Sequence, residues 1–221
     1  MIRLVNFLLF IENISDYSKK VIDNGQTPLD VYNVCSIIRE SFCRSYSIRK
    51  DNNLYIYFDS THILIKFKGN SLRYLGSDER SQALLLKKAL DKLNGVETIK
   101  SQRMQKSTPG IFVKRLLKGE SILENIIDLY NDKIIVINEF EKENMKSDII
   151  NLEELDNLRE YCYIFPFPQN SRSTVDFLGL IDENYKLKYA NLSNIKGIEN
   201  KILYVNFLID QKENVDKELN R

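Results

Sequence analysis

Nearly continuous apolar runs, typical of buried strands, alternate along this chain with segments whose apolar residues recur at helical spacing. The runs at residues 5–10, 133–138 and 161–165 have the first pattern. This alternation constrains the fold more than any other feature, because strands that alternate with helices build a sheet covered by helices. It predicts an α/β fold whose sheet is mostly parallel in its second half. The sequence has no internal repeat or clear linker, so residues 1–221 are expected to form one domain.

The first predicted helix has a clear start signal. Thr27 is expected as its N-cap, Pro28 fits the first turn, and Asp30 follows three residues after the cap. Its apolar stripe comprises Val31, Val34, Cys35, Ile38 and Phe42.

A hairpin is predicted next, from β-rich runs at residues 54–58 and 62–67. Ser77 is then expected to cap a second helix, with Asp78 and Glu79 at its positive end. The remaining predictions are a loop at 100–106, a strand at 111–113, helices at 121–130 and 153–160, a loop at 166–170, a helix at 174–181, a strand at 186–190 and a helix at 198–210.

Charge is unevenly distributed along the chain. Residues 1–120 carry 20 Lys and Arg against 12 Asp and Glu, a net charge of +8, and the remaining residues carry 12 against 19, a net charge of −7. A basic half in a nearly neutral protein suits a chain that presents one face to a polyanion. Two ordinary solvated surfaces explain the same counts, and the composition does not decide between them.

Several functional classes find no support in the sequence. Neither a phosphate-binding P-loop nor a dinucleotide-binding glycine fingerprint occurs, and His62 is the single histidine, which disfavours histidine-based catalysis. The cysteines Cys35, Cys43 and Cys162 are too few and too scattered for a disulfide framework or a zinc site, so a cytoplasmic location and no bound metal are expected. No apolar run approaches the length needed to span a membrane.

Two polar turns, about thirty residues apart, are the best candidates for ligand contacts. The first contains Asp78, Glu79 and Arg80, where helix capping explains the two carboxylates and Arg80 could either pair on the surface or reach a phosphate. The second is Ser107-Thr108-Pro109-Gly110, whose hydroxyls and N–H groups could contact a ligand or simply form a turn.

Taken together, these segments resemble a known family. The residues that carry the resemblance are Leu29-Asp30, Ile48-Arg49-Lys50-Asp51, Ser71-Leu72-Arg73-Tyr74-Leu75, Asp78-Glu79-Arg80, Lys87-Lys88-Ala89-Leu90 and Ser107-Thr108-Pro109-Gly110-Ile111. In this order they are similar to motifs of the archaeal tRNA pseudouridine(54) N1-methyltransferases, a family of the SPOUT superfamily. The resemblance extends over residues 27–138.

The resemblance implies a SPOUT-type sheet with a C-terminal trefoil knot, a homodimer, and S-adenosylmethionine as cofactor. It implies methyl transfer to N1 of a pseudouridine in the tRNA T-loop, with no role for DNA or a membrane. Residues 1–120 would face the RNA and residues 121–221 would form the knot. The RNA-binding residues would be Arg49, Lys50, Arg80, Arg103, Lys106, Ser107, Thr108, Lys114 and Arg115. The cofactor-binding residues would be Phe165, Pro166, Phe167, Leu192, Ser193 and Ile202, and no residue is assigned to catalysis.

The C-terminal half departs from the family pattern. Where the family has a Gly-Asp-His turn, this chain has Pro166-Phe167-Pro168-Gln169-Asn170, and a proline there removes an N–H group. Where the family has Ser-Pro-Leu, it has Asn191-Leu192-Ser193. Three hypotheses follow: an active methyltransferase with an altered pocket, an inactive homologue that binds RNA, or a structural homologue with another partner.

Overall fold

The computed structural model describes residues 4–94, 103–117, 120–126, 133–138, 149–166 and 185–219. Its strands are β1 (Val5–Ile11), β2 (Asn52–Phe58), β3 (Ile63–Lys68), β4 (Gln105–Thr108), β5 (Ile111–Arg115), β6 (Lys133–Asn138), β7 (Tyr161–Pro166) and β8 (Lys186–Asn191). Its α-helices are α1 (Lys19–Asp23), α2 (Leu29–Phe42), α3 (Glu79–Asn94), α4 (Ile122–Ile126) and α6 (Ile198–Leu219).

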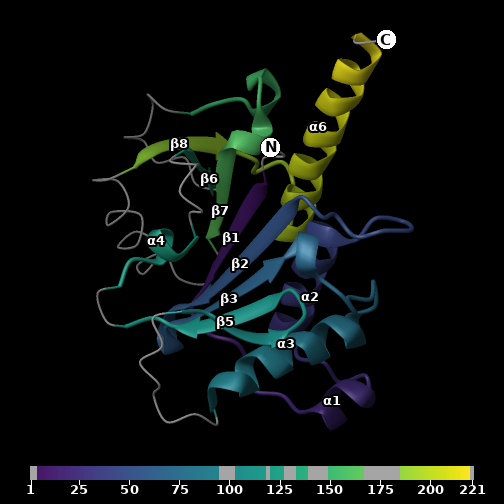
Figure 1. Cartoon of the computed structure of the whole chain (residues 1–221), viewed down its shortest axis with the longest axis vertical. Coiled ribbons are helices and arrows are strands. Elements are labelled where there is room, and N and C mark those ends of the chain that lie inside the picture. Colours follow the sequence, from purple (N-terminus) through teal and green to yellow (C-terminus); the bar gives the residue numbers. More distant parts are fainter. Residues whose placement is uncertain are drawn as a thin grey trace.

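The described strands form a single sheet in the order β4-β5-β3-β2-β1-β7-β6-β8 (Figure 1). The five strands from β2 to β8 in that order run parallel to one another, while β3, β5 and β4 continue the sheet with antiparallel pairs. The prediction of an α/β fold with a mostly parallel second half is therefore confirmed. Because β1 pairs with both β2 and β7, the basic and acidic halves of the chain share this sheet.

Both faces of the sheet are covered, which explains the continuous apolar runs in the sequence. In β1, Phe7 and Leu9 pack into the core beneath α2, α3 and α6, whereas Leu8 and Phe10 pack into a second core on the opposite face. Figure 1 shows α2, α3 and α6 together on the first of these faces. A strand buried on both faces has no need for alternating polar residues.

The predicted helices α2 and α6 are confirmed, with small corrections at their ends. The N-cap of α2 is Pro28 rather than Thr27, and it makes no side-chain capping bond. The apolar stripe of α6 packs into the core through Ile198, Ile202 and Val205, and the helix runs to Leu219 rather than ending near residue 210.

At the start of α3, the capping acceptor is Asp78 instead of Ser77. The Asp78 carboxylate accepts the N–H of Ser81 at 2.7 Å. Serine and aspartate are comparable capping residues, so a sequence in which they are adjacent does not distinguish them.

Three further predictions differ from the structure. The helix predicted at 153–160 is replaced by two 3₁₀ turns, η3 (Leu152–Glu154) and η4 (Leu158–Glu160), each started by an asparagine side chain that accepts a backbone N–H. Residues 105 and 106 of the predicted loop pair with β5 instead. Pro166 closes β7, beside Phe10, rather than opening a loop; it lies beyond the last pair with β6, Val136 with Ile164, so its missing N–H interrupts no pairing on that side.

The hairpin 54–58/62–67 and the strand 186–190 are confirmed as β2–β3 and β8. The helix predicted at 174–181 and most of the predicted loops 100–106 and 166–170 lie outside the described residues. The connection from β7 to β8 does so too, so the trefoil knot stays a prediction. Within the described part of the chain, no helix is long and apolar enough to cross a membrane.

Candidate functional site

The carboxyl ends of the five parallel strands meet at one edge of the sheet. Ile11, Phe58, Asn138, Pro166 and Asn191 are the last residues of these strands. In open α/β sheets, ligands bind in crevices outside this edge, because the connecting loops there are free to shape a site. A cavity at the ends of these strands is therefore the expected place for a ligand.

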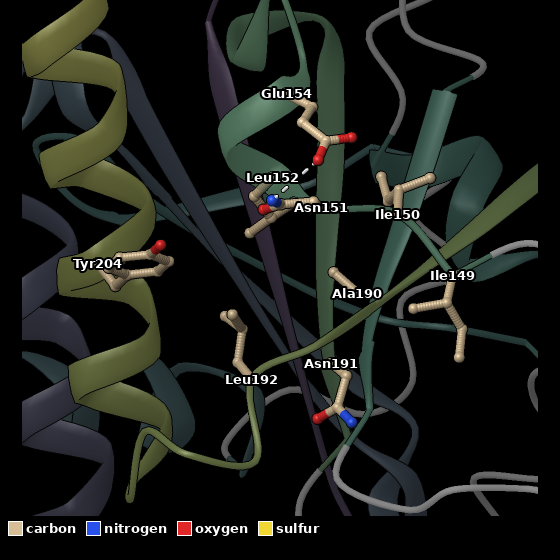
Figure 2. Close-up of a pocket in the computed structure, with 9 residues that line it drawn as sticks. All are labelled: Ile149, Ile150, Asn151, Leu152, Glu154, Ala190, Asn191, Leu192 and Tyr204. Carbon is tan, nitrogen blue, oxygen red and sulfur yellow. Dashed lines mark hydrogen bonds between the residues drawn. The ribbon is translucent and has the colours of Figure 1, made fainter.

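A cavity of about 430 Å³ lies at the end of β8 (Figure 2). It is lined by Ile149, Ile150, Asn151, Leu152, Glu154, Ala190, Asn191, Leu192 and Tyr204. Figure 2 shows Tyr204 of α6 on one side and Ile149 and Ile150 on the other, with Ala190 and Leu192 between them. The volume falls in the range of small-molecule sites, and most lining side chains are apolar.

One wall is formed by residues 149–154, which run beside β8. Ile149 forms a parallel bridge with Tyr189, and the N–H of Ile150 donates to the Tyr189 carbonyl at 2.8 Å. Asn151 then starts η3, and its amide group donates to Glu154 Oε1 at 3.2 Å. The backbone of this wall is thus fixed by hydrogen bonds.

The opposite wall carries a phenol held by a carboxylate. Tyr204 Oη donates to Glu153 Oε1 at 2.6 Å. This hydrogen bond, together with burial and the Glu153 charge, raises the pKa of Tyr204 to about 12. Lys212, two turns further along α6, donates to the Glu153 backbone carbonyl at 2.9 Å. Tyr204 is therefore a neutral, positioned group at neutral pH.

The floor of the cavity continues into a tight turn before α6. Asn191 Oδ1 accepts the N–H of Ser193 at 2.9 Å, and the N–H of Ile195 donates to the Leu192 carbonyl at 3.0 Å. Gly197, at φ +82°, completes the turn and α6 begins at Ile198. This turn directs Leu192 toward the cavity.

The residues predicted to bind the cofactor lie in different places in the structure. Leu192 lines the cavity and Ser193 lies directly beside it. Phe165 and Ile202 are 1% and 0% exposed and contribute to the core. Pro166 ends β7 at the same edge of the sheet, and Phe167 lies outside the described residues.

Sequence reasoning missed the other wall of this cavity. Asn191 could have been found, since it directly follows a predicted strand, and Tyr204 lies on the helix face beside the predicted apolar stripe. Residues 149–154 carry no periodic signal, because a 3₁₀ turn of three residues is too short to produce one.

The two polar turns singled out in the sequence meet at the opposite edge of the sheet. Gly110, at φ +83°, packs against the backbone of Leu72 so closely that an added Cβ would lie 2.5 Å from its Cα. The N–H of Arg73 donates to the Pro109 carbonyl at 3.4 Å, and the N–H of Lys68 donates to the Gly110 carbonyl at 2.8 Å. Only glycine allows this approach.

The residues predicted to bind RNA fall into three groups. Lys50, Arg80, Arg103, Lys106 and Arg115 are exposed. Ser107 and Thr108 are half-buried in β4. Arg49 and Lys114 are buried and form ion pairs with carboxylates within the protein.

The exposed cations do not form one patch. Arg115 pairs with Ile63 at the edge that carries the cavity, and its guanidinium donates to the Thr61 carbonyl at 2.8 Å. Arg80 lies near the opposite edge, where it pairs with Asp23 at 2.8 Å.

The buried cations have structural partners. Arg49 makes two hydrogen bonds to the Asp210 carboxylate, at 2.8 and 2.6 Å. Lys114 contacts the carboxylate of Glu120 and donates to Asn125 Oδ1 at 2.8 Å. Burial opposes the charge on Glu120, but the hydrogen bonds from Lys114 and the Leu117 N–H hold its pKa below the usual range. These guanidinium and ammonium groups stabilise the fold, and the structure does not present them to a ligand.

His62 is not placed as a catalytic residue at either edge of the sheet. It adopts the left-handed conformation, with φ 52°, and its ring bonds Tyr57 Oη at 2.9 Å. Among the described residues, no cluster of histidine, cysteine, aspartate or glutamate could hold a metal ion.

Comparison with known proteins agrees with the motifs. The sequence model of a family described as "Putative SAM-dependent RNA methyltransferase" matches residues 16–149. This match contains the two polar turns and ends at the first residue that lines the cavity.

Similar curated proteins share one name, tRNA (pseudouridine(54)-N(1))-methyltransferase. That of Methanocaldococcus jannaschii is 30% identical over 134 residues, which cover 59% of this chain and 64% of the relative. Those of Haloferax volcanii and Methanococcus aeolicus are 31% and 33% identical, over 53% and 50% of this chain and 59% and 56% of the relatives. The chain thus spans about six tenths of the length of the curated relatives it matches. Because the family model covers more than half of the sequence, the chain belongs to this family of SAM-dependent RNA methyltransferases.

Proposed function

We propose that this protein uses S-adenosylmethionine to methylate N1 of pseudouridine 54 in the T-loop of tRNA. The observation that carries the proposal is the family match over residues 16–149, together with relatives that all bear the name of this activity. The proposal also includes the SPOUT-type knot, a homodimer and a cytoplasmic location, which the family resemblance implies.

The described walls of the cavity fit S-adenosylmethionine. Ile150 and Leu192 offer apolar surface of the kind that packs against an adenine ring. Asn151 and Glu154 offer an amide and a carboxylate to the polar hydroxyl and amino groups of such a molecule. The cavity volume, about 430 Å³, suits a ligand of this size.

When bound, the cofactor supplies an electrophilic methyl group. The chain must then hold the target ring in line with that group while N1 loses its proton, and positioning of this kind lowers a barrier more than any single acid or base. Tyr204, neutral and fixed by Glu153, would orient groups in the cavity rather than remove a proton. Arg115, exposed at the same edge, would hold a phosphate of the RNA.

An RNA-binding protein that does not transfer methyl groups is the second candidate. The family match ends at residue 149, so β7, β8 and α6, with most of the cavity, lie beyond it. Pro166 also stands where the family has glycine, and proline has no N–H to offer a ligand.

Calorimetry separates the two candidates. We expect S-adenosylmethionine to release or absorb heat on binding and to raise the melting temperature, and tRNA to bind with an affinity that falls as salt increases. A protein that binds tRNA but shows neither heat nor stabilisation at millimolar cofactor would support the second candidate. A protein indifferent to tRNA at low salt would contradict both.

A further inference from the structure

Two neighbouring loops at the amino ends of the parallel strands each present an exposed tyrosine. The first is the turn at residues 43–48, which follows α2, and the second is the loop at residues 72–76, which precedes α3. Tyr46 is fully exposed, and Tyr74 is 77% exposed. Single exposed aromatic residues are common, so what matters is how these two are held.

The turn at 43–48 is a small hairpin with Tyr46 at its tip. Cys43 and Ile48 form an antiparallel bridge, and the N–H of Arg44 donates to the Ser47 carbonyl at 2.8 Å. In Figure 1 this turn projects from the molecule on the side where α3 begins. Tyr46 is therefore fixed at its backbone while its ring has no protein surface to cover.

The loop at 72–76 holds Tyr74 in an unfavourable conformation. Its φ of 65° is rare for a bulky residue, and such strain persists only where the surroundings enforce it. Leu72 and Leu75, on either side, are buried. Ser81 Oγ donates to the Tyr74 carbonyl at 3.3 Å and accepts the N–H of Gly76 at 3.0 Å. These contacts direct the ring outward.

The two loops contact each other at both ends. The Cys43 thiol donates to the Gly76 carbonyl at 3.9 Å, and Lys50 Nζ donates to the Leu72 carbonyl at 3.2 Å. The two tyrosines therefore belong to one surface, which we call the two-tyrosine surface, with Lys50 and Arg73 beside them.

The surface is basic. Lys50 and Arg73 are exposed, and neither has a carboxylate partner in the part of the chain that the structure describes. Aromatic rings interleaved with unpaired cations are the arrangement that binds single-stranded nucleic acid, where bases stack on rings and cations contact phosphates. A protein partner would instead need apolar area around the rings, and the exposed side chains beside them, Ser45, Ser47, Lys50 and Arg73, are polar or charged.

We propose that Tyr46 and Tyr74 stack on unpaired bases of an RNA strand whose phosphates contact Lys50 and Arg73. This inference rests on the proposed function, because it names the surface that would anchor the RNA substrate. The surface lies at the amino ends of the parallel strands, and β1, seven residues long, separates the two edges by about 23 Å. The bases bound here are thus distinct from the base that receives the methyl group.

The test compares Tyr46→Ala, Tyr74→Ala and the two corresponding phenylalanine variants in binding to an unmodified tRNA, measured by fluorescence anisotropy. Each alanine variant should weaken binding about tenfold, because a stacked ring is lost. Phenylalanine should preserve binding. The salt dependence should not change, because no cation is removed. Tyr32→Ala, which removes a 42%-exposed tyrosine from α2, is the matched control and should bind like the unaltered protein.

Three results would overturn the inference. If the alanine variants bind tRNA as the unaltered protein does, the tyrosines are not part of the RNA site, although the proposed function stands. If they convert a dimer into a monomer in light scattering, the surface joins two copies of the chain. If the unaltered protein binds no tRNA, the proposed function fails together with the inference.

Discussion

Replacing Asp210 by asparagine should lower the free energy of unfolding by about 2 kcal/mol. The Asp210 carboxylate accepts two hydrogen bonds from Arg49, whose side chain is only 8% exposed. Removing one partner of a fully buried ion pair costs about 3–5 kcal/mol, because the remaining charge is left unpaired. Here Asp210 is 35% exposed and asparagine keeps one acceptor, so water and the amide recover part of that cost.

Urea unfolding of the two proteins measures this difference. The matched control is Arg44→Ala, which removes the hydrogen bond from Arg44 to Asp210, at 2.9 Å. The Arg44 side chain is 43% exposed. An exposed pair of this kind contributes about 0.5 kcal/mol. If Asp210→Asn destabilises the protein no more than Arg44→Ala does, then the buried pair of Arg49 and Asp210 stabilises the fold no more than an exposed ion pair.

The same pair has a pH signature. Burial opposes the charge on Asp210, but the Arg49 hydrogen bonds and nearby guanidinium charges lower its pKa in the folded protein. A lowered folded pKa gives stability that is present above the ordinary aspartate pKa, about 3.9, and lost as pH falls through the lowered value. The difference between the unaltered protein and Asp210→Asn should therefore be constant near neutral pH and shrink below about pH 4.

Three further predictions follow from the turns and the cavity. Gly110→Ala should lower the free energy of unfolding in urea by about 3 kcal/mol, because its Cβ would meet Leu72 at a positive φ. Gly25→Ala, at φ +68° with nothing within 4 Å, is the control and should lower it by about 1 kcal/mol. Equal losses would contradict the role of the close approach between Gly110 and Leu72. Leu192→Asp should weaken S-adenosylmethionine binding at least tenfold in calorimetry and leave tRNA binding unchanged, and retained affinity would remove the cavity from the cofactor site. Arg115→Ala should weaken RNA binding and reduce its salt slope by about one, and an unchanged slope would exclude Arg115 from the phosphate contacts.

The spacing of apolar residues predicted the strands that are buried on both faces and the helices that are buried along one side. Examples are the apolar runs that form β1, β6 and β7, and the stripe of Ile198, Ile202 and Val205 on α6. The exact caps were missed, since Ser77 and Asp78 are adjacent and equally able to cap α3. Local competition of this kind is decided by a few ångströms of backbone path, which the sequence does not encode in any short pattern.

Long-range pairing explains the remaining differences. The family resemblance predicted that Arg49 binds phosphate, yet Asp210, 161 residues away, reaches it in the fold. Lys114 is also paired within the protein, although its partner Glu120 is only six residues away. The family resemblance placed Leu192 in the cofactor site, but Tyr204 enters the cavity only through the packing of α6. The sequence alone gives no measure of which charges become buried.

Methyl transfer itself tests the central claim most directly. The protein is incubated with S-adenosylmethionine and two transcripts of one tRNA, with pseudouridine or uridine at position 54, and the nucleosides are separated by mass spectrometry. We expect N1-methylpseudouridine from the first transcript and no methylated nucleoside from the second. A protein that binds the pseudouridine transcript yet transfers no methyl group to it would contradict the proposed function.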